Sequence, residues 1–301
     1  MSFASSLRWI LAPCAGLAML LTCAAGDVSA QYLMMPDSTN NRLALFDPQT
    51  GAVVNQNYFG LAAGTPVHAM QVGDQIWVAE QLGDRVARWD LAGQPLSPLT
   101  ALMDNVRGME QVGNTVYVCS TGTGNGAPGR QVVLFDATSG ANTGNFLTPA
   151  SSGFGILSHQ GGLLVSSDAA NDDIHRYTLA GASLGTFHNT TSVNFAEQMD
   201  FAPNGDIWVA AFSSNIVARL DPNTGAFLSS FPASGARGVK QLGNGNVMWT
   251  NGSGAWVYDI ATQQSTQVYT GGGRFIDTLN IPEPAAGALL MAIVPVLRRR
   301  H

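Results

Sequence analysis

A pattern that recurs about every 42 residues, the spacing of a β-propeller blade, runs through most of the 301-residue chain. Each copy has a short apolar segment, a polar turn, and a second segment that ends in an aromatic or aliphatic residue. These second segments are followed by Asp or Thr at positions 47, 90, 136, 178, 221 and 259. Several short strands per repeat at this spacing indicate an all-β ring of blades.

The number of blades follows from where the repeat begins. Later copies open with one more strand, for example around His68, Arg107 and Arg237, whereas the first copy lacks this strand and begins at Gln31. A matching segment stands at the far end, at residues 274–280. The sequence therefore predicts a six-bladed β-propeller of four-stranded blades over residues 31–280, closed when strand 274–280 joins the N-terminal blade.

Composition supports this fold and excludes other classes. Charged residues make up 11% of the chain, Lys240 is the sole lysine, and there are 34 glycines. So few Lys and Glu residues exclude a helical bundle, and the glycines suit tight turns between strands. The net charge of −6 leaves no basic surface for nucleic acid.

The first 30 residues have the pattern of a secretory signal peptide. Arg8 precedes an apolar stretch, and small residues at 28 and 30 predict cleavage between Ala30 and Gln31 after Sec-dependent export. A membrane anchor and a lipoprotein signal ending at Cys23 are the alternatives. Cleavage at Ala30 leaves Cys119 as the single cysteine, so no internal disulfide is expected.

The last residues, 281–301, form a second signal with three parts. Residues 282–284 are Pro-Glu-Pro, an apolar segment follows, and the chain ends in an arginine cluster. This tail resembles the PEP-CTERM sorting signal, and an ordinary tail anchor is the alternative. Its motif residues are Pro282, Glu283, Pro284, Arg298, Arg299 and Arg300.

The PEP-CTERM resemblance implies processing by an exosortase and only transient contact with the membrane. It also implies delivery to the outer envelope surface or extracellular matrix of a Gram-negative bacterium. The partners expected there are exopolysaccharide or another surface protein.

Residues 33–47 resemble the NHL-type and YVTN-type repeats of bacterial propellers, and residues 76–90 and 207–221 echo them. Such propellers serve as binding platforms, and their relatives include lactonases and lyases. The resemblance does not decide between these roles. Because the sequence offers few candidate catalytic residues, we expect a non-catalytic binding or structural module. The alternative is a metal-dependent hydrolase or lyase of the gluconolactonase-like type. No Gly-x-Ser-x-Gly or His-Glu-x-x-His motif is present, and the glycine-rich residues 122–129 are expected to form a long turn.

Two groups of residues could form a metal site, although no cofactor is expected. Oxygen ligands are densest in one polar turn and could bind Ca²⁺, but Asp and Asn are also ordinary turn residues. This turn contains Asp168, Asn171, Asp172 and Asp173. A lactonase-like site would instead need pore-lining residues of several blades to converge on one divalent metal: His68, Glu110, Glu197 and Asp277.

Arg107, Arg237 and Arg274 occupy equivalent positions in three opening strands, which places them at one height around the channel. With His68 and Glu197, they could bind an anionic ligand such as a carboxylated or sulfated glycan. The favoured alternative is that the arginines form salt bridges between blades, with Glu110, Asp277 or Glu197 as partners.

Overall fold

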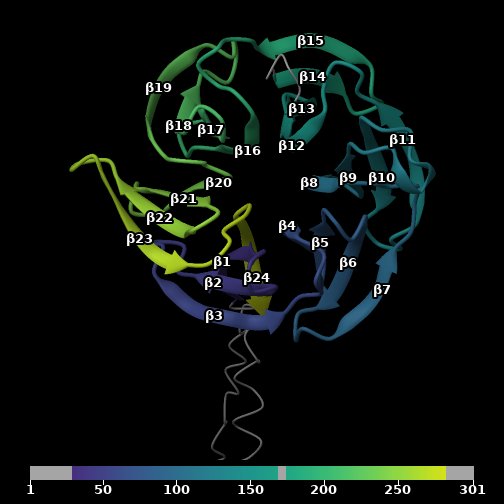
Figure 1. The fold of residues 1–301 in the computed structure, drawn as a ribbon, viewed down its shortest axis with the longest axis horizontal. Helices are drawn as coiled ribbons and strands as arrows, with labels where there is room; N and C mark the ends of the chain where they lie inside the picture. The colour runs from purple at the N-terminus through teal and green to yellow at the C-terminus, as the bar shows by residue number, and fades with distance from the viewer. Residues whose placement is uncertain (1–28, 169–173, 283–301) are drawn as a thin grey trace, which may run out of the picture. The chain divides into compact units, whose positions relative to one another are not determined.

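The computed structural model describes residues 29–168 and 174–282, and within them six four-stranded antiparallel sheets form a ring (Figure 1). We call the centre of the ring, between the innermost strands, the channel. The predicted six-bladed β-propeller is confirmed. Residues 1–28 of the expected signal peptide and residues 283–301 of the sorting tail lie outside the described residues. In the described part of the chain, no helix is long and apolar enough to cross a membrane.

Each blade begins with its innermost strand and ends with its outermost. Blade 1 is β24 (Asp277–Pro282), β1 (Ser29–Asp37), β2 (Arg42–Phe46) and β3 (Val53–Gly60); blade 2 is β4 (Pro66–Val72), β5 (Gln75–Glu80), β6 (Arg85–Asp90) and β7 (Pro95–Leu99). Blade 3 is β8 (Val106–Val112), β9 (Thr115–Ser120), β10 (Gln131–Asp136) and β11 (Asn142–Leu147); blade 4 is β12 (Gly153–His159), β13 (Gly162–Ser167), β14 (Ile174–Thr178) and β15 (Ser183–His188). Blade 5 is β16 (Ala196–Phe201), β17 (Ile207–Ala211), β18 (Ile216–Leu220) and β19 (Phe227–Pro232); blade 6 is β20 (Gly238–Gln241), β21 (Val247–Asn251), β22 (Gly254–Asp259) and β23 (Gln264–Thr270).

The aspartate that ends many third strands stabilises the turn that follows it. Asp47 Oδ1 accepts hydrogen bonds from the backbone N–H groups of Gln49 and Thr50, and Gly51 then adopts a φ of 73°. The Thr50 hydroxyl and these N–H groups hold the pKa of Asp47 below its usual value. Such a turn returns the chain antiparallel, and it recurs after Asp136 and Asp221.

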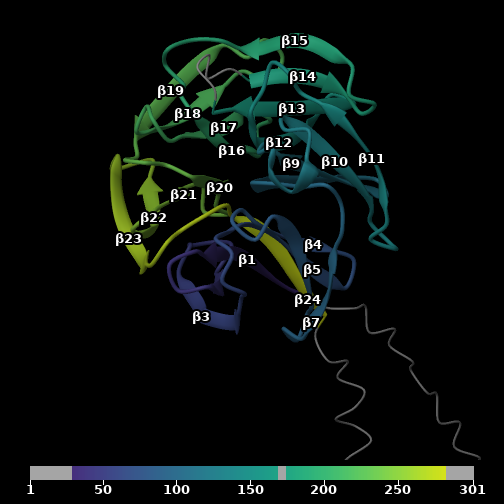
Figure 2. The same ribbon diagram turned by 45° about the vertical axis from the view of Figure 1, so that its right-hand side comes forward.

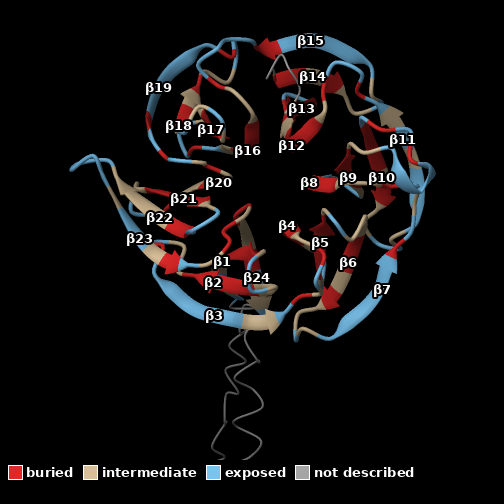
Figure 3. Cartoon of the chain, viewed as in Figure 1, coloured by how far each residue is buried: buried red, intermediate tan, exposed pale blue. Residues whose placement is uncertain are grey.

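The apolar core lies between neighbouring blades, and the outermost strands face solvent (Figure 3). Trp77 of β5 and Phe135 of β10, for example, are fully buried and meet edge to face with centroids 6.5 Å apart. Burying a side chain of this size contributes about 1.5–3 kcal/mol. Each blade is therefore held in place chiefly by its neighbours.

The ring closes as predicted, through pairing of β24 with β1 (Figures 1 and 2). The predicted limits of the closing strand, 274–280, are wrong at both ends, since β24 spans Asp277–Pro282. Ile276 does not join the strand because its N–H and C=O both bond to the side-chain amide of Gln198, at 2.9 and 2.6 Å. At its other end, β24 includes the first proline of the Pro-Glu-Pro motif.

Candidate functional site

The innermost strands line the channel in a common register. Met109, Ile156, Met199 and Val239 pair with equivalent middle-strand residues: Val118, Val165, Val209 and Trp249. The residues two positions before these four, at the N-terminal ends of the inner strands, form one layer, which we call the arginine layer. It consists of Arg107, Phe154, Glu197 and Arg237, with Arg274 beside them.

Irregularities in the inner strands fall at this layer. The register shifts between Val106 and Met109 in β8, and between Ala196 and Met199 in β16. A bulge leaves an extra residue outside the ladder and re-aims its side chain. Arg107 and Glu197 lie in these bulged segments, which places their side chains where neighbouring blades meet.

Two of the three arginines pair with carboxylates. Arg237 Nη1 lies 3.2 Å from Glu197 Oε1, and Arg107 forms an ion pair with Asp168. Their guanidiniums also lie over aromatic rings, that of Arg107 4.5 Å from the Phe154 centroid and that of Arg237 4.6 Å from the Phe212 centroid. These contacts join adjacent blades.

Arg274 differs from the other two. Its Nε donates to the hydroxyl of Ser38 at 2.9 Å, and no carboxylate of the described residues lies within ion-pair distance. Burial and the neighbouring Arg237 guanidinium lower the pKa of Arg274 to about 10. Arg274 is therefore a partly buried cation whose charge is poorly compensated.

Glu197 is the central anion of this layer. Its side chain is 1% exposed, and its Oε2 has no hydrogen-bond partner. Burial raises the pKa of Glu197 to about 7, although all three arginines act in the opposite direction. Among residues 29–168 and 174–282, the layer thus contains three guanidiniums against Glu197 and Asp168, an excess of positive charge.

The next layer along the channel is filled, and we call it the plug: His68, Gln198 and Phe275. The equivalent positions of the other three blades are Gly108, Gly155 and Gly238, where an added Cβ would meet neighbouring backbone atoms. A Cβ on Gly155 would overlap the carbonyl oxygen of Glu197, so only glycine permits this strand spacing. Gln198 is fixed in the plug because its Oε1 accepts hydrogen bonds from the backbone N–H groups of Val239 and Ile276.

Beyond the plug is an acidic layer: Glu110, Asp200, Lys240 and Asp277. With the plug, it surrounds a cavity of about 50 Å³. Lys240 Nζ lies 3.1 Å from Asp200, and His68 Nε2 lies 3.4 Å from Asp277 Oδ2. His68 Nδ1 accepts the Met109 N–H, so in the neutral ring the proton is on Nε2 and faces Asp277.

Burial raises the pKa of Asp200 to about 6 and also raises that of Glu110. Burial acts against the charged form of Lys240, but Asp200 and Asp277 outweigh it and raise the pKa of this amine. The basic and acidic groups in this part of the channel are therefore paired mainly with each other.

The structure places the predicted residues in two separate groups. Arg107, Arg237, Arg274 and Glu197 lie together in the arginine layer, whereas His68 lies in the plug. Glu110 and Asp277 lie beyond the plug, so Glu197 does not converge with them on one metal. Asp200, Lys240 and Gln198 were not identified from the sequence as site residues, although the uniqueness of Lys240 was a usable signal.

The predicted calcium turn is mostly untested. Asp168 pairs with Arg107, while Asn171, Asp172 and Asp173 lie outside the described residues. Across residues 29–168 and 174–282, no group of three or more His, Cys, Asp or Glu side chains is arranged to hold a metal ion. The remaining cysteine, Cys119, is buried, which raises its pKa to about 12.

Known structures share the whole ring. No family model and no curated protein matches the sequence. A protein of unknown function from Bacteroides caccae is 15% identical with a TM-score of 0.63, covering 84% of this chain and 99% of its own. A chain of a nidogen/laminin complex is 10% identical with a TM-score of 0.68, covering 83% and 98% respectively.

A catalytically inactive virginiamycin B lyase from Staphylococcus aureus, crystallised with quinupristin, is 14% identical with a TM-score of 0.56. It covers 80% of this chain and 85% of its own. The fold is that of NHL/YVTN-like propellers. At these identities, the similarity extends to the fold alone.

Proposed function

We propose that the protein is an exported, non-catalytic binding module that takes carboxylate groups at the arginine layer. The observation that carries this proposal is Arg274, a partly buried guanidinium that donates to a hydroxyl and has no carboxylate of the described residues within ion-pair distance. A guanidinium binds a carboxylate through two parallel hydrogen bonds. A ligand carboxylate would supply the negative charge that this layer lacks.

Export rests on the two terminal signals. In this proposal, the Sec machinery and an exosortase handle the chain, which reaches the envelope surface or matrix after transient membrane contact. Exopolysaccharide bearing uronic acids is a suitable ligand there, because its carboxylates match the excess positive charge of the arginine layer.

A hydrolase or lyase is the alternative, and the fold also occurs in streptogramin B lyases. The acid–base groups of this channel, however, surround about 50 Å³, room for a few water molecules rather than an organic substrate. Lys240 is also paired with Asp200, and His68 with Asp277. We therefore favour binding over catalysis.

Replacement of Arg274 tests the binding proposal. We expect Arg274→Gln to weaken binding of an oligogalacturonate at least tenfold, since a charge-assisted hydrogen bond contributes about 1.5–3 kcal/mol. The melting temperature should change little, because removal of the repulsion from Arg237 offsets the loss of the attraction to Glu197 and of the hydrogen bond to Ser38. Isothermal titration and thermal unfolding measure the two effects.

The matched controls are Arg88→Gln, on β6 of another blade, and the methyl-esterified oligogalacturonate, which has the same sugars without their charge. The control variant should bind normally, and the neutral ester should not bind at the arginine layer. Equal affinity of Arg274→Gln and the unaltered protein for the acidic ligand would refute the proposal.

Intact-mass measurement of the protein recovered from the cell surface tests export and sorting. We expect a chain that begins at Gln31 and lacks residues 285–301. A mature N-terminus elsewhere would revise the cleavage site, and retention of Arg298, Arg299 and Arg300 would overturn the sorting hypothesis.

A further inference from the structure

Blade 3 carries a loop that blades 1, 2, 5 and 6 lack. Residues 121–130 join β9 to β10. The corresponding links of blades 1, 2 and 5 are shorter: residues 38–41, 81–84 and 212–215. This is the glycine-rich turn expected from the sequence, and it contains one short 3₁₀ helix, η1 (Gly124–Gly126).

The loop is fixed to neighbouring segments. The Gly124 N–H donates to Asp104 Oδ2 at 2.7 Å, and Asn125 Nδ2 donates to Asp84 Oδ2 at 3.0 Å. The Ala127 N–H closes the turn on the Gly124 carbonyl at 2.9 Å. These bonds to the second blade and to the link between blades hold the loop in one position.

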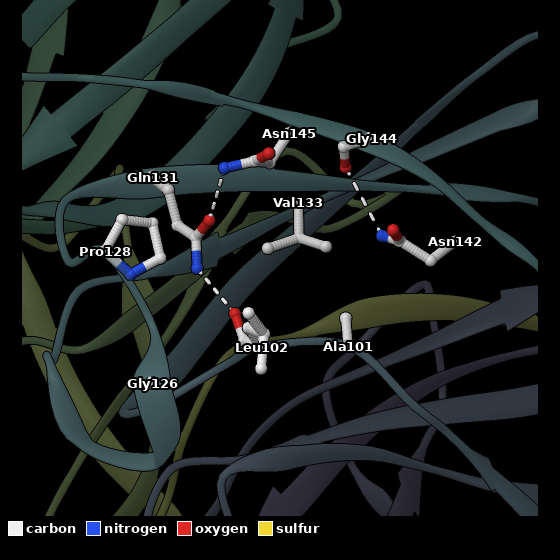
Figure 4. A pocket seen from close by; sticks show the side chains of 9 residues that line it. All are labelled: Ala101, Leu102, Gly126, Pro128, Gln131, Val133, Asn142, Gly144 and Asn145. Carbon is white, nitrogen blue, oxygen red and sulfur yellow. Dashed lines mark hydrogen bonds between the residues drawn. The ribbon is translucent and has the colours of Figure 1, made fainter.

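A cavity of about 360 Å³ lies beside this loop. Its walls combine apolar side chains with amides: Leu102, Pro128, Gln131, Val133, Asn142 and Asn145 (Figure 4). None of the residues that line it is ionisable. It is therefore unlike the channel, where charged groups predominate.

The amides are held in defined orientations. Gln131 is 2% exposed; its Nε2 donates to the Leu102 carbonyl, and its Oε1 accepts from Asn145 Nδ2, both at 2.7 Å (Figure 4). Asn142 Nδ2 donates to the carbonyls of Leu134 and Gly144. The side-chain nitrogen of each asparagine thus donates to the protein, which leaves its Oδ1 as an acceptor for a ligand.

We propose that this cavity binds a neutral saccharide unit. Amide oxygens accept the hydroxyl groups of a sugar, while Val133, Leu102 and Pro128 can contact its C–H faces. A charged ligand would lose its hydration here without meeting an opposite charge. A peptide is less suitable, because the cavity presents side-chain amides and the β10–β11 ladder is irregular beside it, shifting register between Leu134 and Phe135.

This inference is independent of the carboxylate site, which lies in the channel. Its test uses the full-length protein and three neutral probes: maltotetraose, cellotetraose and mannotetraose. Tetra-alanine serves as the peptide probe. Saturation-transfer NMR detects contact, and calorimetric titration gives the affinity.

We expect at least one tetrasaccharide to bind with a Kd in the millimolar range or below. Asn145→Ala and Asn142→Ala should each weaken this binding at least tenfold, which corresponds to about 1.4 kcal/mol. Both side chains are exposed, so Asn142→Ala should melt like the unaltered protein. Asn145→Ala should melt at a slightly lower temperature, because it removes the donor to the buried Gln131 Oε1. Asn57→Ala, an exposed asparagine on outer strand β3 of blade 1, is the matched control and should bind normally.

Arg274→Gln should leave the saccharide affinity unchanged, so failure of the carboxylate proposal and failure of this one are distinguishable. The inference is overturned if none of the three tetrasaccharides binds, or if Asn145→Ala binds as well as the control. It is also overturned if tetra-alanine binds in their place.

Discussion

A chain that ends at Gly273 is expected to lose several kcal/mol of stability compared with one that ends at Pro282. The shorter chain lacks β24 and with it three buried side chains: Phe275, Ile276 and Leu279. Burial of each such side chain contributes about 1.5–3 kcal/mol. A whole domain is stable by only about 5–15 kcal/mol, so the ring should unfold at a much lower denaturant concentration.

The chain ending at Pro282 is the matched control, since both variants lack residues 283–301. Its midpoint in urea should equal that of the full chain, and a synthetic peptide of residues 274–282 should partly restore the shorter chain. Identical midpoints for the two truncations would show that β24 does not close the ring.

Arg237→Gln is expected to cost about 3–5 kcal/mol, because it leaves the buried Glu197 without its nearest cation. This outcome contrasts with Arg274→Gln, for which no loss of stability is expected. Urea unfolding at a fixed pH measures both. The two substitutions thus separate a structural arginine from one that is free to bind a ligand.

The loss of folding stability caused by Arg237→Gln should also depend on pH. Burial raises the pKa of Glu197 from its ordinary 4.5 to about 7, so the folded state binds this proton more tightly than the unfolded state. The stabilising effect of protonation is fully present below about pH 4.5 and is lost as the pH rises through 7. Removing Arg237 raises this pKa further, so the variant should lose most stability above pH 7 and least near pH 5.

The double variant Arg237→Gln/Glu197→Gln is the control for this explanation. Without the buried carboxyl, the extra pH dependence should disappear, and part of the stability should return. If Arg237→Gln lost the same stability at pH 5 and at pH 8, the uncompensated charge of Glu197 would not be the cause of its destabilisation.

The repeat allowed the fold to be predicted because each blade is encoded by nearby residues. The strand–turn pattern recurs locally, as in the bonds of Asp47 and Asp221 to their own turns. The missing first strand and the extra segment at residues 274–280 then predicted the closure. The limits of β24 could not be predicted, because they depend on Gln198, a residue distant in the sequence.

The channel was only partly predictable for a similar reason. Equivalent positions in the opening strands placed the three arginines at one height, and Glu197 was among their expected salt-bridge partners. Its choice of Arg237 depends on a bulge in β16 that no repeat alignment shows. Asp200 and Lys240 repeat the position of Glu110, yet only the structure brings them together. The cavity of blade 3 depends on contacts of the loop with Asp84 and Asp104 in other segments.

The plug has a consequence for how the molecule meets charged surfaces. It separates the excess positive charge of Arg107, Arg237 and Arg274 from the carboxylates of Glu110, Asp200 and Asp277, three residues further along the strands. This separation of charge contributes an electric dipole along the axis of the ring. Salt weakens this dipole only partly, because partly buried charges are screened less than exposed ones. A negatively charged surface therefore exerts a torque that turns the arginine end toward it before contact, so the ring approaches with its arginine layer first.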